Sequence, residues 1–297
     1  MARSLSVAVK SYPHTAFLTD PAFTAGGHPV TLEAADPIYR AFAPMVRELR
    51  YDVSELAIAT FLQAHEAGAP ISLLPVVLSG DFHHHSLTRW PGSAALAPAD
   101  LAGRRVGVRA YSQTTGLWVR GILHEEYGVD AKDVTWVTTE EPHVAEYVEP
   151  PNVERTSGKV LDILGRGDVA AAVLGPPALD SAEGPLVPVI PDWRAAEEAW
   201  GVRHATVPIN HMLTVRQDFL EAEPGAVADL YTAFGARIEE RKAEPDPGPR
   251  VRALRFGVTD ELVAGLQVAI DYALQQNVIR TPVTVAELLA DFTRHLG

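Results

Sequence analysis

LAGRRVGVRAYSQTTGLWVRGILHEEYGV, residues 101–129, is the stretch of sequence that decides the fold. Its RVGV segment (105–108) is short and β-rich, and apolar residues recur at helical spacing from about Thr114 to Gly128. A polar turn therefore joins a strand to the start of a helix. Such a turn presents unpaired N–H groups and the positive end of a helix dipole, which suit a carboxylate or another anion.

The side chains of this turn add hydrogen-bond donors without adding charge. They are Ser112, Gln113, Thr114 and Thr115. One interpretation is a binding site for an anionic ligand. The alternative is a helix cap, because Ser and Thr are favoured at that position for purely structural reasons.

The same alternation of short strand patterns and longer helix patterns continues on both sides of this unit. Strand patterns cover residues 5–9, 71–78, 133–137, 169–174 and 211–215. Helix patterns cover residues 37–49, 223–241, 260–276 and 283–295, a strand pattern passes into a helix pattern over 51–65, and 244–250 is a Pro-rich loop. This order predicts an α/β fold with a largely parallel sheet, and 297 residues are enough for about two domains.

Composition excludes several classes of function. The net charge of −13 argues against a nucleic-acid partner, which clustered Lys and Arg would have to bind. The absence of cysteine removes thiol nucleophiles, disulfides and Cys-based metal sites. No run of 18 apolar residues predicts a membrane span. No basic segment followed by an apolar stretch opens the chain, so we expect a cytoplasmic protein without a membrane partner.

Four segments together resemble one family. They are YDVSELA (51–57), RVGVRAYSQTTGLWVRGILHEEYGV (105–129), GKVLDILGRGDVAAAVLGPP (158–177) and VPINHMLTVRQDFLEAEP (207–224). In this order they are similar to 4,5-dihydroxyphthalate decarboxylase and its relatives.

The resemblance implies the two-lobed type 2 periplasmic-binding-protein fold, with a ligand cleft between the lobes. Residues 1–96 and 206–297 would form one lobe, and residues 97–205 the other. A small aromatic carboxylate would bind in the cleft, and closure of the lobes would expel water and strengthen the charge interactions inside it. The sequence does not fix the oligomeric state, and a homo-oligomer is one hypothesis.

Three short motifs match the family with informative departures. YPHT (12–15) resembles a family YDHT, and PINH (208–211) resembles a family PIMH with Asn210 as the variant residue. SGDFHHHSL (79–87) resembles a family SRxFRHS, so His84 falls on the family histidine. Gly80 and His83 stand where the family usually carries arginines, which would grip a substrate carboxylate in a two-pronged pair. The departure predicts a substrate with fewer carboxylates than a phthalate.

Decarboxylation of an electron-rich ring requires a proton at the carbon that carries the carboxylate. We rank His211 first as the proton donor, His84 second and Glu55 third. Each has a structural alternative: Glu55 could pair with an arginine, and His211 could be a buried histidine bonded to backbone. The remaining candidate substrate contacts are His14, Ser54, Arg120, Asn210 and the 112–115 turn. Arg120 either supplies the missing positive charge or pins its helix to the sheet.

No organic cofactor is implied. A divalent cation bound by His14, His84 and His211 is one hypothesis, and the alternative is that these histidines hydrogen-bond the substrate or loops. The prediction is a non-oxidative decarboxylase of a hydroxylated aromatic carboxylic acid. The rival prediction is a solute-binding or transport-related protein of the same fold for a small aromatic or anionic ligand.

Overall fold

Two separate β-sheets organise the chain, which is seen here in a computed structural model that describes residues 3–175, 186–245 and 248–297. The first sheet is mixed, with parallel neighbours around β1 and antiparallel pairs around β5 and β12. Its strand order is β13 (Arg255–Phe256), β5 (Ile71–Gly80), β12 (Ile209–Arg216), β4 (Val53–Ala57), β1 (Leu5–Ala8), β3 (His28–Leu32) and β2 (Thr24–Ala25).

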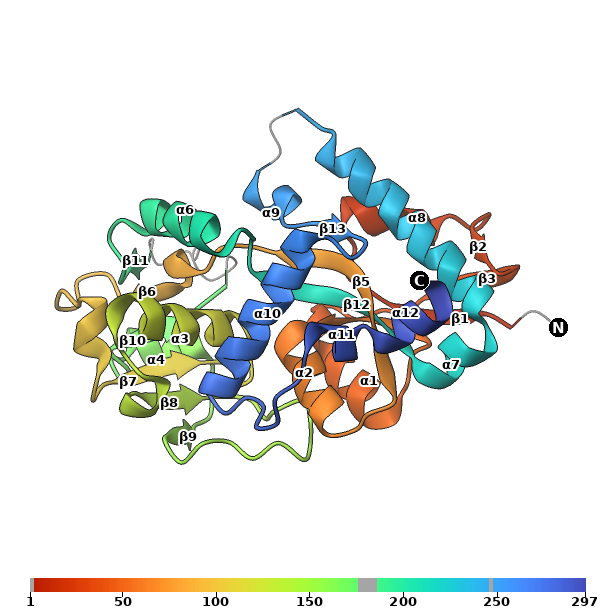
Figure 1. Cartoon of the computed structure of the whole chain (residues 1–297). Coiled ribbons are helices and arrows are strands. Elements are labelled where there is room, and N and C mark those ends of the chain that lie inside the picture. The colour runs from red at the N-terminus through yellow and green to blue at the C-terminus, as the bar shows by residue number, and fades with distance from the viewer. Residues whose placement is uncertain (1–2, 176–185, 246–247) are drawn as a thin grey trace.

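The second sheet is parallel through its centre, and two antiparallel strands complete one edge. Its strand order is β11 (Val187–Pro188), β6 (Leu87–Arg89), β10 (Ala171–Val173), β7 (Arg105–Val108), β8 (Thr135–Thr138) and β9 (Val153–Arg155). Each sheet is the centre of one lobe, and the two lobes lie side by side in Figure 1.

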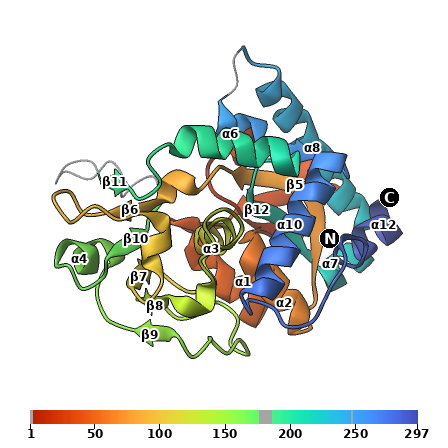
Figure 2. The same ribbon diagram turned by 60° about the vertical axis from the view of Figure 1, so that its left-hand side comes forward.

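Helices cover both sheets and also fill the space between them. The α-helices are α1 (Phe42–Glu48), α2 (Ile58–Glu66), α3 (Thr114–Tyr127), α4 (Val160–Gly165), α6 (Trp193–His204), α7 (Gln217–Ala222), α8 (Pro224–Lys242), α9 (Pro249–Arg252), α10 (Asp260–Gln275), α11 (Val285–Leu288) and α12 (Ala290–Leu296). The 3₁₀ helices are η1 (Pro13–Thr19), η2 (Ile38–Ala41), η3 (His84–Ser86), η4 (Pro98–Leu101) and η5 (Ala131–Asp133). Helix α3 of the second lobe contacts α10 and α2 of the first, as Figure 2 shows near its centre.

The chain crosses between the lobes earlier than the sequence predicts. Strand β6 pairs with β10 and β11 of the second sheet, so residues 87–89 belong to the second lobe rather than to the first. The predicted boundary at residue 96 is wrong in this respect. The segment is short and lies between polar stretches, so its hydrophobic pattern alone could not assign it to a sheet.

Most of the predicted elements are present, and the differences have physical reasons. Helix α6 was not predicted, because only Glu197 and Trp200 of its twelve residues are buried and it has a weak apolar face. The predicted helix 283–295 is two helices that divide at Leu289, and the predicted loop 244–250 ends in α9. Among the described residues, no helix is both long and apolar enough to cross a bilayer.

One hydrophobic core continues from lobe to lobe. Buried Trp118 on α3 donates a hydrogen bond from Nε1 to the carbonyl of Ile209 on β12, at 2.9 Å. Tyr272 on α10 packs edge-on against the same indole, with 5.8 Å between ring centroids. The two lobes are therefore packed together over apolar surface as well as joined by the chain.

Gly121 on α3 makes this packing possible, and its replacement is expected to destabilise the fold. A Cβ at residue 121 would lie 1.9 Å from Cδ2 of the buried Tyr272 ring, so Gly121→Ala must push α3 and α10 apart. We expect the free energy of unfolding to fall by about 2–3 kcal/mol, as measured by urea denaturation. The matched control is Gly225→Ala, also in a helix, where a Cβ meets nothing within 4 Å. Equal stability of the two variants would contradict this account.

Candidate functional site

A carboxylate and an imidazole on neighbouring strands form the strongest candidate for a chemical site. Glu55 lies on β4 and His211 on β12, where the antiparallel register places His211 opposite Ala57, two residues from Glu55. Side chains two residues apart on a strand share a face, and His211 Nδ1 lies 2.5 Å from Glu55 Oε1. The glutamate side chain is completely buried, whereas the histidine side chain is 22% exposed. Of the two groups, the imidazole is therefore the one that a ligand can reach.

Glu55 is held in its ionised form by three donors. The backbone N–H of Lys10 donates to Oε2 at 2.9 Å, and the Tyr12 hydroxyl donates to Oε1 at 2.9 Å. Burial alone raises the pKa of the Glu55 carboxyl, but the hydrogen bond and charge of His211, together with Lys10 and Tyr12, hold that pKa below its usual range. Burial and the charge of Glu55 raise the pKa of Tyr12, so its phenol keeps the proton that it donates.

This arrangement fixes which nitrogen of His211 is available for chemistry. Since ionised Glu55 only accepts hydrogen bonds, Nδ1 carries the proton in their bond. Nε2 has no hydrogen bond to any residue that the structure describes. The pair can therefore hold a proton at Nε2 and stabilise the resulting imidazolium through the buried carboxylate.

His143, which the sequence analysis did not select, joins this region from the second lobe. The Phe42 ring meets both His211 and His143 edge-on, with centroid distances of 5.3 and 5.5 Å. His143 Nδ1 is bonded to the Thr60 hydroxyl of α2 at 2.9 Å, and Arg47 of α1 donates to the His143 carbonyl at 2.6 Å. The signal that could have found His143 is its position just after the carboxyl end of a parallel strand, β8.

The turn before α3 lies against the start of α2. The Thr114 hydroxyl accepts a hydrogen bond from the Ala59 N–H at 3.2 Å, so the N-terminal ends of the two helices meet across the lobes. Ser112 is buried in the same turn and Thr115 is half-buried. Gln113 Oε1 is buried and accepts no hydrogen bond from the part of the chain that the structure describes. Thr114 therefore caps the start of α2 and not its own helix, α3, whose N-cap residue Gln113 makes no side-chain capping hydrogen bond.

The structure does not bring the three proposed metal ligands together. His14 Nε2 bonds to the Leu78 carbonyl at 3.0 Å, and its ring stacks on Tyr12. His84 Nε2 bonds to Glu126 of α3 at 3.1 Å, and its side chain is completely buried. Among residues 3–175, 186–245 and 248–297, no three His, Asp or Glu side chains are placed to hold a metal ion. The described residues therefore do not assemble the predicted set of His14, His84 and His211, and His84, the second-ranked proton donor, is buried against Glu126 instead.

The other residues of the HHH run also have partners of their own. His83 Nε2 donates to Asn210 Oδ1 at 2.7 Å, which occupies the oxygen of that predicted substrate contact. His85 Nδ1 bonds to Glu197 of α6 at 2.6 Å. His84 and His85 lie in the short helix η3, and His83 is its N-cap residue.

Two further expectations about substrate contacts are corrected. Ser54 is completely buried and its hydroxyl donates to the backbone carbonyls of Ala8 and Glu55, so it stabilises the first sheet. Arg120 is also completely buried, and it donates to Tyr111 and to Gln276 of the first lobe. Neither side chain is placed to touch a ligand directly.

The two positions that lack the family arginines have steric and electrostatic explanations. A Cβ at Gly80 would lie 2.6 Å from the carbonyl oxygen of Pro208 and 2.8 Å from the Ala253 side chain, so only glycine fits this backbone. Burial lowers the pKa of His83 to about 4, so this imidazole is neutral near pH 7. Neither position can supply a cation to a bound carboxylate.

Two neutral histidines are expected to make the fold sensitive to acid. Burial lowers the pKa of His83, and burial with the charges of Arg109, Arg47 and His211 lowers that of His143, to about 4 in each case from 6.5. The unfolded chain therefore binds more protons below about pH 6.5, and stability falls as the pH drops toward 4. Each residue accounts for about 3 kcal/mol at most over this range.

The measurement is urea unfolding at about pH 7.5 and about pH 4.5 for the wild type and His143→Gln. We expect the variant to lose less stability than the wild type, because glutamine does not titrate. Identical losses would show that His143 binds a proton equally well in both states. His295→Gln, at the half-buried end of α12, is the control and should behave as the wild type does.

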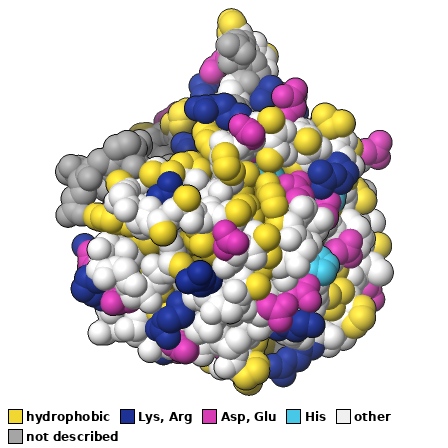
Figure 3. All heavy atoms as spheres, turned by 90° about the vertical axis from the view of Figure 1, so that its left-hand side faces the viewer, with side chains coloured by type: hydrophobic (Ala, Val, Ile, Leu, Met, Phe, Trp, Pro, Cys, Tyr) yellow, Lys and Arg dark blue, Asp and Glu magenta, His cyan; other side chains and the backbone are white. Residues whose placement is uncertain are grey.

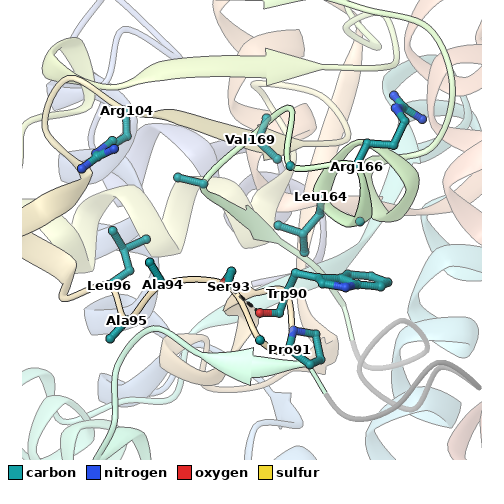
Figure 4. A pocket seen from close by; sticks show the side chains of 14 residues that line it. Trp90, Pro91, Ser93, Ala94, Ala95, Leu96, Arg104, Leu164, Arg166 and Val169 are labelled. Atoms are coloured by element: carbon teal, nitrogen blue, oxygen red, sulfur yellow. Dashed lines mark hydrogen bonds between the residues drawn. The ribbon is translucent and has the colours of Figure 1, made fainter.

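Cavities elsewhere in the molecule do not include the Glu55–His211 pair. A cavity of about 500 Å³ lies between the 90–96 segment and the end of α4, and Figure 4 shows that its labelled side chains include two arginines but no histidine or acid. Others of about 1010 and 480 Å³ border α6. On the face of the second lobe in Figure 3, Lys and Arg are interspersed with Asp and Glu.

Solved structures with the same architecture define the class of fold. The aliphatic sulphonate-binding protein SsuA of Escherichia coli superposes with a TM-score of 0.59 at 13% identity and covers 98% of both chains. The alkanesulfonate-binding SsuA of Xanthomonas axonopodis pv. citri gives 0.57 at 15%, covering 97% of this chain and 96% of that one. The desulfurization enzyme DSZB gives 0.57 at 18%, covering 99% of each. The chain has the two-lobed type 2 periplasmic-binding-protein fold.

Sequence comparison identifies the family within this class. A 4,5-dihydroxyphthalate decarboxylase of Comamonas testosteroni is 30% identical over 251 residues, which are 77% of this chain and 73% of that protein. A protein of the same name from Pseudomonas putida is 35% identical over 138 residues, 45% of this chain and 52% of the relative. No protein-family model matches. The chain belongs to the 4,5-dihydroxyphthalate decarboxylase family.

Proposed function

We propose that this protein is a non-oxidative decarboxylase of a hydroxylated aromatic carboxylic acid. The observation that carries the proposal is the Glu55–His211 pair, in which a fully buried carboxylate orients a partly exposed imidazole whose Nε2 makes no hydrogen bond to the described residues. The relatives named as decarboxylases supply the reaction class. A protein that only binds its ligand has no need of a proton donor held in this way.

In the proposed reaction, His211 in its protonated form gives the proton on Nε2 to the ring carbon that bears the carboxylate. The bond between that carbon and the carboxylate carbon then breaks, its electron pair returns to the ring, and carbon dioxide leaves. Glu55 stabilises the imidazolium before transfer, and a proton from water restores it afterwards. Ring hydroxyl groups assist because they raise the electron density at the carbon that receives the proton.

The same proposal places the substrate against the 112–115 turn. The start of α3 offers N–H groups and a positive dipole end for the carboxylate, and Gln113 Oε1 would accept a hydrogen bond from a ring hydroxyl. Because Gly80 and His83 offer no cation, we propose a monocarboxylate rather than a phthalate-type dicarboxylate as the preferred substrate.

The test is carbon dioxide release from a panel of hydroxylated benzoates and phthalates, each with and without added divalent cations. We expect turnover of one or more monocarboxylates, and slower turnover of the corresponding phthalates. Turnover that requires the cation would add a metal to the mechanism. No carbon dioxide from any compound under either condition would refute the decarboxylase, and binding without turnover would favour the rival solute-binding function.

A further inference from the structure

Arg120 is a buried positive charge that has no carboxylate partner among the residues that the structure describes. Its side chain is completely buried on α3, where Nε donates to Gln276 Oε1 and Nη2 donates to the Tyr111 carbonyl, both at 2.7 Å. Nη1 has no hydrogen-bond partner in residues 3–175, 186–245 and 248–297. No Asp or Glu within the described parts of the chain forms an ion pair with it, and its hydrogen-bond partners are an amide and a carbonyl oxygen. Buried charges usually have an opposite charge beside them, because leaving water costs several kcal/mol that neutral partners rarely offset.

The unpartnered nitrogen lies next to the first turn of α3. Nη1 would be 3.0 Å from a Cβ at Gly116, the third residue of the helix, and the carbonyl that Nη2 contacts belongs to the residue before Ser112. This follows from helix geometry, because a side chain leans toward the N-terminus and reaches the residue four positions earlier. The guanidinium therefore lies beside the first turn of α3 and next to the 112–115 turn.

Aromatic rings keep water away from this charge. The guanidinium carbon is 3.9 Å from the ring centroid of Tyr111 and 5.2 Å from that of Trp136. Burial lowers the pKa of the Arg120 guanidinium, with the charges of Tyr111 and Tyr147 opposing the shift, and no carboxylate contributes among the main causes. The field of the cation is thus weakly screened toward the helix start, where the dipole of the 14-residue α3 adds a potential of the same sign.

We propose that the counter-ion of Arg120 is the carboxylate of the bound aromatic acid, held at the 112–115 turn. Arg120 is then a positioning residue, which does not touch the ligand and acts through the first turn of α3. It gives the site a preference for anions that the family arginines absent at positions 80 and 83 do not supply. This inference rests on the proposed function only in taking an aromatic acid as the ligand, since it concerns binding and not turnover.

The experiment compares a charged ligand with a neutral ligand of the same shape. Calorimetric affinities are measured for 4-hydroxybenzoate and 4-hydroxybenzamide with wild type, Arg120→Met and Arg120→Lys. We expect the wild type to prefer the acid, Arg120→Met to bind the acid about 10- to 100-fold more weakly with the amide unchanged, and Arg120→Lys to restore most of the preference. If Arg120→Met does not fold, Arg120→Gln replaces it with the same expected loss.

A matched control separates charge from general damage to the fold. Arg255 is also buried, but it pairs with Glu261 and contacts Thr206, so Arg255→Met should leave the acid-to-amide ratio unchanged. The proposal is overturned if Arg120→Met keeps the wild-type ratio, or if Arg255→Met changes the ratio as much. Acid binding by the wild type with an unaltered ratio in Arg120→Met would leave the decarboxylase proposal intact. Failure of the wild type to bind any acid of the carbon dioxide panel would overturn both.

Discussion

His211→Gln should lower kcat by about 100- to 10,000-fold, which is the usual contribution of a positioned acid or base. Glutamine keeps a polar side chain of similar reach on β12, but it has no titratable nitrogen to carry a proton to the ring. Because Nδ1 is engaged with Glu55, the loss falls on the chemistry at Nε2. The measurement is kcat for carbon dioxide release, with substrate affinity determined separately by calorimetry.

The comparison of turnover with affinity decides between the two classes of function. A decarboxylase should lose turnover while ligand affinity changes little, whereas a solute-binding protein would show a change in affinity alone. His124→Gln is the control, because His124 is exposed on α3 and pairs with Asp130 at the surface. Wild-type kcat in His211→Gln would exclude the proposed proton donor.

The sequence predicts both Glu55 and His211 as site residues, but it does not predict that their side chains are in contact. Glu55 and His211 are 156 residues apart, and their contact depends on the antiparallel register of β4 and β12. Hydrophobic patterns predict that each strand exists, while the register also depends on pairings along the whole sheet. For this reason the two residues were ranked as separate candidates rather than as one unit.

The site residues that the sequence does not predict correctly depend on packing between distant segments of the chain. His84 matches a family histidine, yet η3 turns it onto Glu126, and no local pattern specifies that direction. His143 follows a strand and contacts Thr60 of the other lobe, which sequence spacing cannot reveal. In contrast, the 105–108 strand and the helix that ends at Gly128 were predicted well, because periodicity and a left-handed glycine are local signals.

Glu55→Gln should lower kcat almost as much as the replacement of His211 itself. Glutamine has the same shape, but without the negative charge it no longer favours the protonated imidazole that donates to the ring. We expect kcat near neutral pH to fall by about 100-fold or more, with substrate affinity nearly unchanged. Glu33→Gln is the control, because Glu33 is a half-buried acid of the same lobe that bonds to Ser6 and contacts no histidine. Turnover at the wild-type rate in Glu55→Gln would remove the carboxylate from the mechanism.

The same substitution also changes how stability depends on pH. The pKa of Glu55 is lower in the folded protein than in the unfolded chain, because burial, which raises it, is outweighed by the hydrogen bond and charge of His211 together with the hydrogen bonds from Lys10 and Tyr12. Its contribution is therefore complete above about pH 4.5, the ordinary glutamate range, and is lost as the pH falls through the lower folded value. We expect the difference in unfolding free energy between wild type and Glu55→Gln to shrink as the pH falls below about 4.5. A difference that grows as the pH falls below about 4.5 would mean that Glu55 is protonated in the fold, and His211 would then lack the anion on which the proposed proton transfer depends.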